Sequence, residues 1–583
     1  MITKSIKSLI AACRLCCGAA AALALTACAD WDDHYDADQS LLDSQHATIW
    51  QNISQNSNLS QFAELLKKAG YDQVLAAPQT FTVWAPVNGS FDYAAVAAMS
   101  NDRLLTEFVE NHIARNNYPA SGTVAQRVYT LNEKLMLFGG TGSYAIQGVG
   151  IDKPNVAAAN GTVHLLNGQI PFLQNIYESL NNYEYPIDSI SNYFHNFDVR
   201  KLNELKSVQG PTLNGEITYL DSIFDENNEL FTRYYAYVNR EDSNYSMIVP
   251  TNEAWRKAKA TVSKYFNYLP TFEFMENTST GADRKKVSVN IRDVAYLKDS
   301  VVNQMLTENL FFNNNIYDNR KLAAADAATN FSCDSLYSTT YCKLYAEDAA
   351  RLLENTRRIT KSNGYVWLTD DSLRMRTWTV WNPELRIEAE NRNVIASSVN
   401  VANDNEPARV YVTPGTQNPD VTGQLSANAY LDVQPVSQST NPGVVFYLPN
   451  VRSTTYSLYL VTVPPVITNA RNATKPYRFS VTMGYADASG KNQDNDRSWV
   501  AESAFVSDSL QVDTIYLGDF TFPMAYYGTG DYYPYLRVNS AVTSRERANY
   551  DRNLRIDCII LRPKELDDYL KQHPGYKYDT GLY

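Results

Sequence analysis

The sequence is poor in the residues on which metal and acid–base sites depend. It has 6 His and 7 Cys in 583 residues. It contains no HExxH or GxSxG motif, no glycine-rich phosphate loop and, after residue 27, no CxxC pair. Carboxylate pairs arise by chance among 63 Asp and Glu residues, so they do not indicate a glycosidase. We therefore expect a protein without catalytic activity and without a metal centre.

Charge is also scarce, and its sign excludes two further classes of protein. Charged residues make up 20% of the chain, and 44% of the residues are hydrophobic, which excludes a wholly disordered polypeptide. The formal net charge of -12 disfavours a nucleic-acid-binding role and attachment to anionic membranes through a basic patch. The 12% share of aromatic residues, with 41 Tyr, favours β-rich extracellular domains.

The N-terminus has the organisation of a targeting segment. Basic residues precede an apolar, Ala-rich stretch from Leu15 to Leu25, which is too short to span a bilayer and ends in Leu-Thr-Ala-Cys. This resembles a bacterial lipoprotein signal peptide over residues 1–27, with lipidation of Cys28. The alternative is an ordinary signal peptide cleaved near Ala27. No later apolar run reaches 18 residues, so the lipid would be the one membrane attachment.

Residues 28–45 form a predicted acidic tether, with Asp30, Asp32 and Asp33 close to the cysteine. This stretch resembles the surface-export signal of lipoproteins in Bacteroidetes-type bacteria. The resemblance implies a lipid-anchored protein of the outer membrane that is exposed at the cell surface. In such an oxidising compartment Cys333 and Cys342 are close enough in sequence to form a disulfide, and Cys558 is expected to be a small buried hydrophobe.

Two parts of the chain repeat each other. Residues 82–91 align with residues 246–255, each as a buried strand stopped by Pro and followed by an Asn that can cap a helix. Residues 160–167 align with 363–370, where Asn-Gly provides a tight turn before a strand. A weaker pair joins residues 110–113 to 308–311. The spacings place the additional length of the second copy after Trp255.

These motifs resemble the fasciclin (FAS1) domain, present twice, at residues 46–180 and 190–378. The resemblance implies two α+β domains, each a β wedge with helices packed on it, and adhesion or ligand binding outside the cell. The family's middle motif often reads Tyr-His, whereas this chain has Asn111-His112 and Asn309-Leu310. The departure argues against animal-type receptor binding through that motif. His112 and His164 are expected to be structural, since nothing shows the clustering that a metal site needs.

The C-terminal third has a different pattern. Short alternating runs between Pro, Gly, Asn and Asp clusters predict a β-sandwich over residues 379–566, followed by a tail at 567–583. The first and last of these strands resemble those of jelly-roll carbohydrate-binding modules. Glu388, Glu390 and Asp557 on these strands could hold a structural calcium, or be solvent-facing positions of half-buried strands.

Aromatic residues gather in one Gly- and Pro-containing segment of this region. They could stack on sugar rings as a ligand-binding platform, or pack the loop down and form a protein interface. The candidates are Tyr526, Tyr527, Tyr532, Tyr533 and Tyr535, with Trp499 as a further one. The expected function is adhesion or assembly with an outer-membrane or surface protein through the fasciclin pair. The alternative is glycan binding as an accessory of an outer-membrane nutrient uptake system.

Overall fold

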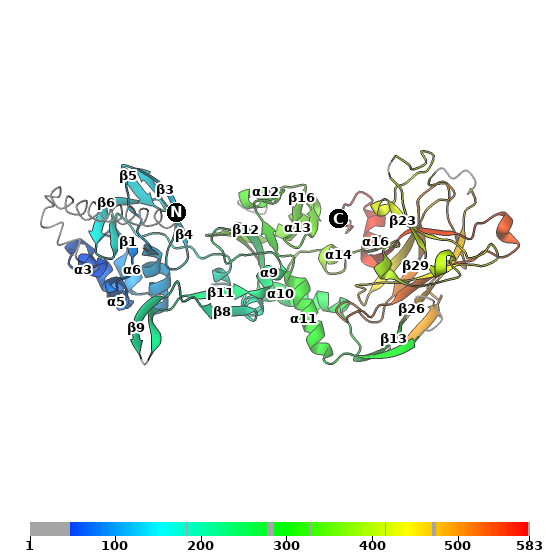
Figure 1. The fold of residues 1–583 in the computed structure, drawn as a ribbon, viewed down its shortest axis with the longest axis horizontal. Helices are drawn as coiled ribbons and strands as arrows, with labels where there is room; N and C mark the ends of the chain where they lie inside the picture. Colours follow the sequence, from blue (N-terminus) through cyan, green and yellow to red (C-terminus); the bar gives the residue numbers. More distant parts are fainter. Residues whose placement is uncertain are drawn as a thin grey trace, which may run out of the picture. The chain divides into compact units, whose positions relative to one another are not determined.

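The structure is a computed structural model that describes residues 47–580 apart from 182–183, 214, 277–284, 326–328, 330, 414 and 469–473. The predicted signal peptide, Cys28 and the acidic tether lie outside the described residues. The chain divides into two compact units (Figure 1). Unit 1 contains the residues up to Leu173 together with Arg200–Glu226, and unit 2 contains Gln174–Val199 and Asn227 onward. None of the helices among the described residues is both long and apolar enough to cross a membrane.

Unit 1 is built on a seven-stranded sheet in the order β2-β1-β7-β6-β5-β4-β3. Strand β1, next to the edge strand β2, is fully buried and pairs in parallel with β7 and antiparallel with β2. The strands are β1 (Phe81–Pro86), β2 (Ile113–Arg115), β3 (Thr123–Tyr129), β4 (Leu135–Thr141), β5 (Ser143–Ile146), β6 (Val149–Ala158) and β7 (Gly161–Leu166).

Helices cover the apolar core that β1 and β7 share. They are α3 (Ile49–Ser54), α4 (Ser60–Lys68), α5 (Tyr71–Ala76) and α6 (Tyr93–Ala97), followed by a helical stretch that runs from α7 (Asn101–Arg103) to η3 (Glu110–His112). Apolar residues of α4 recur at helical spacing, so Phe62, Leu65 and Leu66 are buried together.

A β-hairpin from further along the chain completes unit 1. Its strands are β9 (Val208–Leu213) and β10 (Glu216–Asp221), which pair antiparallel. Val208 is fully buried in the core of unit 1, which fixes the base of the hairpin. Residues 200–226 therefore group with the first copy, although they fall within the stretch 190–378 expected for the second. The ribbon of β8 (Asp198–Leu202) and β11 (Phe224–Asn228) flanks this hairpin in sequence.

Unit 2 repeats the sheet connectivity of unit 1. Its four-stranded sheet has the order β15-β12-β19-β18, in which β12 is parallel to β19 and antiparallel to β15. The register is the same as in unit 1, because Tyr245 pairs with Gly364 as Phe81 pairs with Gly161. The strands are β12 (Tyr245–Pro250), β15 (Phe311–Asn313), β18 (Thr356–Lys361) and β19 (Gly364–Thr369). The stretches around Pro86 and Pro250 thus have one topology.

The helices of this second copy pack on its sheet, as those of unit 1 do. They are α8 (Asp188–His195), α9 (Glu229–Arg233), α10 (Asn252–Val262), α11 (Val294–Thr307), α12 (Asn319–Ala324), α13 (Ala346–Leu353) and α14 (Thr377–Val380). Two short strands, β16 (Ser335–Tyr337) and β17 (Lys343–Tyr345), pair beside α13.

The glycine of each Asn-Gly pair is required by close backbone contact. Gly161 and Gly364 have φ angles of +139° and +138°. A Cβ atom on Gly161 would lie 1.8 Å from the carbonyl oxygen of Phe81, and one on Gly364 would lie 1.9 Å from that of Tyr245. Only glycine can therefore begin strand β7 or β19 beside its parallel neighbour.

The asparagines after the strand-ending prolines do cap helices, but not the helices that follow them. Asn88 Oδ1 accepts a hydrogen bond from the Gln61 N–H of α4 at 3.0 Å. Asn252 Oδ1 accepts one from the Ser189 N–H of α8 at 2.8 Å, while Thr251 caps α10 itself. The expectation of local capping was therefore wrong, because each Asn caps a helix that lies earlier in the chain than its strand, α4 for Asn88 and α8 for Asn252.

The C-terminal part of unit 2 has two six-stranded antiparallel sheets around one apolar core; we call it the two-sheet region. The first strand, β20 (Leu385–Glu388), pairs antiparallel with the last, β31 (Leu554–Pro563). The first sheet contains β20, β22 (Ala408–Tyr411), β23 (Ala429–Val433), β25 (Thr455–Thr462), β29 (Asp513–Thr521) and β31. The second contains β21 (Ile395–Val399), β24 (Gly443–Tyr447), β26 (Arg478–Ala486), β27 (Asn492–Asp496), β28 (Phe505–Val506) and β30 (Tyr535–Ser540).

The extra length of the second copy forms a hairpin that packs on the two-sheet region. Its strands are β13 (Thr271–Glu276) and β14 (Lys285–Asn290), and the turn between them lies outside the described residues. Strand β13 lies beside β26 and β27 (Figure 1). Phe272 and Phe274 enter the core of the two-sheet region, and the Glu273 N–H donates to the Gly490 carbonyl at 2.7 Å. The insertion therefore joins the second copy to the sheets.

The final residues also pack within unit 2. Helix α16 (Lys564–Gln572) contacts β25 and β31, and the rings of Tyr569 and Tyr576 pack at an angle against Trp378 of α14. The Tyr578 hydroxyl donates to Glu384 at 2.8 Å. The segment 567–580, expected as a tail, thus carries aromatic side chains that hold it against the second copy and the two-sheet region.

Candidate functional site

The tyrosine-rich segment lies against the second copy. Tyr526 and Tyr535 are each only 2% exposed. The Tyr526 hydroxyl accepts a hydrogen bond from the Ala486 N–H at 2.7 Å, and the Tyr535 hydroxyl donates to Asp494 at 2.6 Å. Neither ring has a face available to a sugar, so the prediction of these two residues as a sugar platform was wrong.

The three remaining tyrosines of the segment also use their rings for internal packing. Tyr527 packs against Phe266, with ring centroids 5.9 Å apart, and its carbonyl accepts a hydrogen bond from the Tyr268 hydroxyl at 2.7 Å. Tyr532 packs edge-on against Phe274 of the inserted hairpin. Half-buried Tyr533 lies 5.9 Å from the ring of Tyr447. The segment therefore fills the contact between the second copy and the two-sheet region.

Trp499 is also engaged internally. Its ring lies 5.8 Å from that of Phe520, and its Nε1 donates to the Asp496 carbonyl at 3.1 Å. The carbonyl oxygen of Trp499 lies close to Gly518, whose φ angle of +145° accommodates this approach. These contacts give Trp499 a packing role in the two-sheet region.

The acidic residues proposed as calcium ligands lie at the pairing of the first and last strands. Asp557 and Glu390 are 1% and 2% exposed, so they are not solvent-facing positions. Asp557 accepts hydrogen bonds from the Ser426 N–H, and Glu388 accepts one from the Ser426 hydroxyl at 2.6 Å. Burial and the two glutamates raise the pKa of Asp557 to about 8. Among the described residues no group of three His, Cys, Asp or Glu is arranged to hold a metal ion.

The cysteines of unit 2 are thiols. Cys333 and Cys342 are free, so the structure does not contain the disulfide considered from their spacing. Burial raises the pKa of both thiols, most strongly for Cys342. Cys558 is fully buried, as expected for a small hydrophobe, and lies 3.5 Å from the Arg386 guanidinium. These environments keep the three cysteines protonated near neutral pH.

Both motif histidines of unit 1 are fully hydrogen-bonded. His112 Nδ1 donates to the Phe108 carbonyl at 2.6 Å, and its Nε2 accepts from the Ile170 N–H at 2.9 Å. Burial lowers the pKa of His112 to about 4, so the ring is neutral. His164 bonds the Tyr118 carbonyl and the Asn155 N–H and packs beside Trp84. With both nitrogens occupied, neither ring can serve as a base or a metal ligand.

A buried polar cluster beside His112 was not expected from the sequence. The Tyr71 hydroxyl contacts Asp221 of the β9–β10 hairpin at 2.7 Å and Glu110 at 3.1 Å. Burial and the neighbouring Asp221 carboxylate raise the pKa of Glu110 to about 8. Arg115 lies nearby, and both of its terminal nitrogens are buried without a hydrogen-bond partner in the part of the chain that the structure describes. The cluster links the β9–β10 hairpin to the middle motif. Of Tyr71, Glu110 and Asp221, only Glu110 lies in a segment that the two copies share, residues 110–113.

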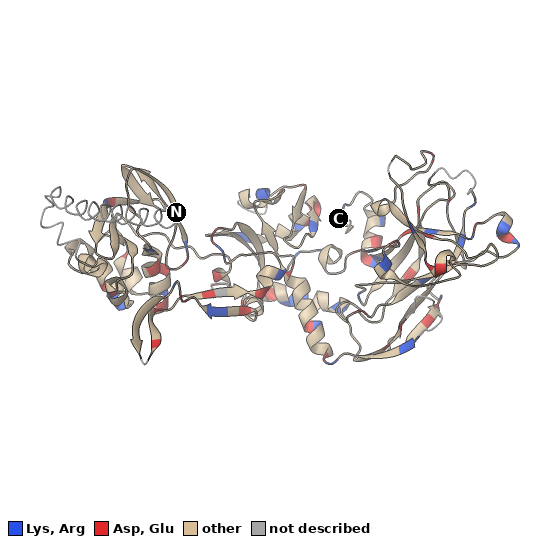
Figure 2. Cartoon of the chain, viewed as in Figure 1, with Lys and Arg blue, Asp and Glu red and all other residues tan. Residues whose placement is uncertain are grey.

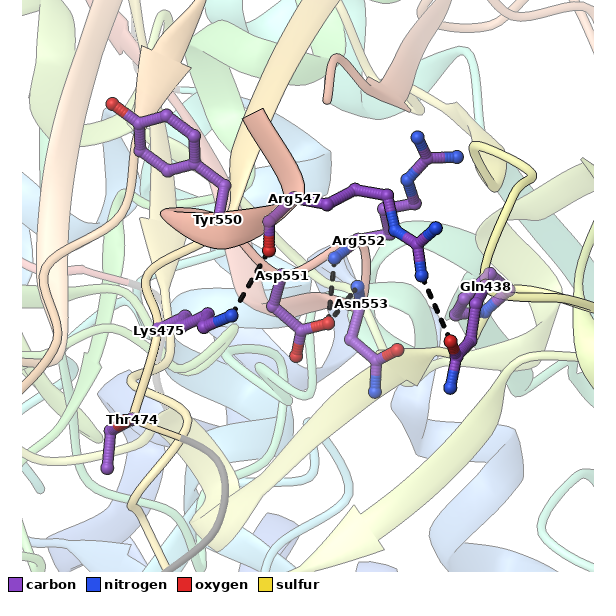
Figure 3. A pocket seen from close by; sticks show the side chains of 9 residues that line it. Gln438, Thr474, Lys475, Arg547, Tyr550, Asp551, Arg552 and Asn553 are labelled. Atoms are coloured by element: carbon purple, nitrogen blue, oxygen red, sulfur yellow. Dashed lines mark hydrogen bonds between the residues drawn. The ribbon is translucent and has the colours of Figure 1, made fainter. Parts of the chain in front are cut away.

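A basic pocket at one end of the two-sheet region was also missed (Figure 3). It is formed by three stretches far apart in sequence, so no local motif could have shown it. The lining residues are Pro435, Gln438, Thr474, Lys475, Arg547, Tyr550, Asp551, Arg552 and Asn553.

A family comparison identifies one part of the chain. The model of the fasciclin domain family matches residues 57–170. Residues 57–170 are a fasciclin domain. This match confirms the resemblance for the first copy, which contains Asn88, His112, Asn160 and the β1–β7 pair. A fasciclin domain suggests a binding or adhesion role. The family match does not extend to the second copy, whose likeness to the first rests on its strand pairing. A search of curated proteins finds no match to the chain.

Three solved structures have weak similarity to the chain. A fasciclin domain pair from the insect cell adhesion molecule fasciclin I is 12% identical, with a TM-score of 0.19, and covers 56% of this chain and 99% of its own. A Paenibacillus xanthan lyase is 14% identical, with a TM-score of 0.18, and covers 35% of this chain and 16% of its own. An exo-β-1,3-galactanase from Phanerochaete chrysosporium is 7% identical, with a TM-score of 0.16 and coverages of 73% and 78%. Similarities this weak do not bear on the function of this chain.

Proposed function

We propose that the chain is a non-catalytic surface lipoprotein that mediates adhesion or assembly with an outer-membrane partner through two fasciclin domains. The first of these is the fasciclin domain of unit 1. The lipid on Cys28 and the surface location rest on the sequence of residues 1–45, which has the order of a lipoprotein signal peptide followed by an acidic tether.

The observation that carries the proposal is the structural equivalence of the two copies. The parallel pairs β1–β7 and β12–β19 have the same register over six residues. Asn160 accepts a hydrogen bond from the Ile49 N–H and donates to the carbonyls of Leu75 and Ala77. Asn363 makes the same three kinds of bond, with the Ile176 N–H and the carbonyls of Val238 and Arg240.

The surface that best suits a protein partner is the β9–β10 hairpin of unit 1. Leu213 and Ile217 are 60% and 52% exposed, and the hairpin contains acidic residues but no Lys or Arg (Figure 2). Exposed apolar side chains on a short two-stranded ribbon are typical of contact sites, because such a ribbon cannot bury them itself. We propose this hairpin as the contact surface.

The C-terminal two-sheet region is proposed to be a jelly-roll-like sandwich that supports the second copy. The antiparallel pairing of β20 with β31 supports this view, since terminal strands commonly pair in such sandwiches. The second candidate function, glycan binding, no longer has the tyrosine-rich segment as its site. It depends instead on the basic pocket at the end of the two-sheet region.

The test is recovery of a partner from outer membranes by the full-length, lipid-anchored protein after chemical cross-linking. The double variant Leu213→Ser with Ile217→Ser is expected to recover at least about ten-fold less partner, as for the loss of anchoring residues at an interface. Leu137→Ser is the matched control, because Leu137 is also 60% exposed in unit 1 but lies on β4. Absence of any partner, or equal recovery by the double variant, would contradict the proposal.

A further inference from the structure

The basic pocket lies where three loops meet at one end of the two-sheet region. Pro435 and Gln438 follow β23, Lys475 precedes β26, and the stretch from Arg547 to Asn553 leads into β31. The pocket has a volume of about 350 Å³. This is within the range of small-molecule sites, and loop-lined ends of β-sandwiches are common places for them.

Three cations line this pocket, and none of them has a carboxylate partner among the described residues. Lys475 Nζ donates to the Arg547 carbonyl at 3.1 Å, and an Arg547 terminal nitrogen donates to Gln438 Oε1 at 3.0 Å (Figure 3). Both acceptors are neutral, so they orient the two side chains without neutralising them. In a chain with a net charge of -12, a pocket of unpaired cations is unusual and favours an anionic ligand.

The third cation is buried. Arg552 is 6% exposed, and its Nε has no hydrogen-bond partner. No hydrogen bond or ion pair among the described residues involves its guanidinium. A guanidinium whose side chain is largely withdrawn from water, with Nε buried and no counter-ion among the described residues, is costly to the folded protein. A bound oxyanion at its terminal nitrogens would compensate this cost.

The one carboxylate of the pocket is already engaged. Asp551 Oδ1 accepts hydrogen bonds from the Arg552 and Asn553 backbone N–H groups at 2.7 and 3.3 Å. Its Oδ2 lies 3.6 Å from Arg555, outside the pocket lining. Asp551 thus shapes the loop and pairs with Arg555, which leaves the three cations for a ligand.

We propose that this pocket binds a saccharide that carries a carboxylate or a sulfate group. The guanidinium groups of Arg547 and Arg552 and the Lys475 ammonium would bind the anion, since planar guanidinium groups match oxyanions. Asn553 and Gln438 offer amides to hydroxyl groups, and half-buried Tyr550 offers a ring face to the sugar. The proposal rests on the second candidate function, glycan binding, and names its ligand class. It is independent of the adhesion function, because the site involves none of the residues of the β9–β10 hairpin.

The test is isothermal titration calorimetry of the full-length protein with three trisaccharide probes: trigalacturonate, a sulfated galactotriose and neutral galactotriose. The expected result is binding of at least one charged probe at least about ten-fold more tightly than the neutral one, because a charge-assisted bond is lost with the anion. Preference for the carboxylate or for the sulfate identifies the anion and supports the proposal either way. The affinity should fall as NaCl rises.

Variants separate the pocket from the rest of the surface. Lys475→Ala and Arg547→Ala should each weaken binding at least about ten-fold, whereas the control Arg545→Ala, an exposed arginine two residues away, should not. Arg552→Met should abolish binding and raise the melting temperature, because it removes an uncompensated buried charge. Equal binding of neutral galactotriose, binding of inorganic phosphate alone, or unchanged affinity in Lys475→Ala and Arg547→Ala would overturn the proposal.

Discussion

The two copies of the repeat differ in the surroundings of the glutamate of their middle motif. In unit 1, Glu110 lies beside Asp221 of the β9–β10 hairpin, and this like charge together with burial raises its pKa. In unit 2, burial raises the pKa of Glu308, while the cationic Arg452 of the two-sheet region acts in the opposite direction. The same motif position thus faces an acidic neighbour in one copy and a basic neighbour in the other.

This difference distinguishes the residues that the shared fold requires from the residues through which each copy contacts its neighbouring elements. The glycines at 161 and 364 and the asparagines at 88, 160, 252 and 363 make the same backbone contacts in both copies. The middle motif and the added hairpins make different contacts in each. The first copy keeps a hairpin with exposed apolar residues, whereas the hairpin inserted in the second packs Phe272, Phe274 and Val289 into the core of the two-sheet region.

The largest expected effect is at the glycines of the parallel pairs. Gly161→Ala and Gly364→Ala should each destabilise their unit by about 4 kcal/mol or more, because the new Cβ overlaps a buried carbonyl oxygen and the backbone must shift. Hydrogen exchange of the β1 and β12 amides as a function of temperature measures the loss of stability in each unit. Gly148→Ala is the control, since its φ is +82° but its Cβ would meet no atom within 4 Å. If Gly364→Ala left the stability of unit 2 unchanged, the two copies would not be structurally equivalent at this position.

The sequence allowed much of this shared framework to be predicted, because it depends on residues with strict backbone requirements. Pro, Asn and Gly at matching spacings identified β1 with β12 and β7 with β19 before any coordinates. The sequence did not allow the hydrogen-bond partners of Asn88 and Asn252 to be predicted, because these asparagines cap helices α4 and α8, which lie earlier in the chain than the strands. For the tyrosine-rich segment the sequence left sugar stacking and internal packing open, because composition does not show which face of a loop is buried; the structure shows internal packing.

The two framework asparagines that bridge strand and helix come next in magnitude. Asn160→Ala and Asn363→Ala should each cost about 2–4 kcal/mol in unfolding free energy, because each leaves a buried N–H and two carbonyls unpaired. Chemical denaturation of the full-length protein gives the values. Asn101→Ala, at an exposed position of α7, should change stability by less than about 0.5 kcal/mol. Unequal losses in the two copies would show that their turns are not equivalent.

A smaller effect is expected where the middle motifs diverge. His112→Leu makes the first copy resemble the second, which has Leu310 at this position. The change should destabilise unit 1 by about 1–3 kcal/mol, since the buried Ile170 N–H loses its acceptor. Thermal unfolding at pH 7 measures it. If His112→Leu were as stable as the original chain, the histidine would have no structural role in unit 1.

A further expected effect is a dependence of stability on pH that distinguishes the two glutamates. Because the pKa of Glu110 is raised from 4.5 to about 8, folded unit 1 binds a proton that the unfolded chain releases between these values. Its unfolding free energy should therefore fall as the pH rises through this window, by up to about 4 kcal/mol, since each pKa unit corresponds to about 1.4 kcal/mol. Glu110→Gln should remove this fall. The unfolding free energy of the variant, relative to that of the original chain, should therefore be higher at pH 8 than at pH 5. Parallel pH profiles for both proteins would contradict the assignment.

The most direct test of the account is cross-linking mass spectrometry of the full-length lipidated protein in outer membranes. The central claim is that the first copy contacts the partner while the second is fixed to the two-sheet region. The account predicts that partner cross-links fall in unit 1, in the fasciclin domain and in residues 200–226 around the β9–β10 hairpin, and that α10 and α11 cross-link within unit 2. Partner cross-links confined to the second copy and the two-sheet region would contradict it.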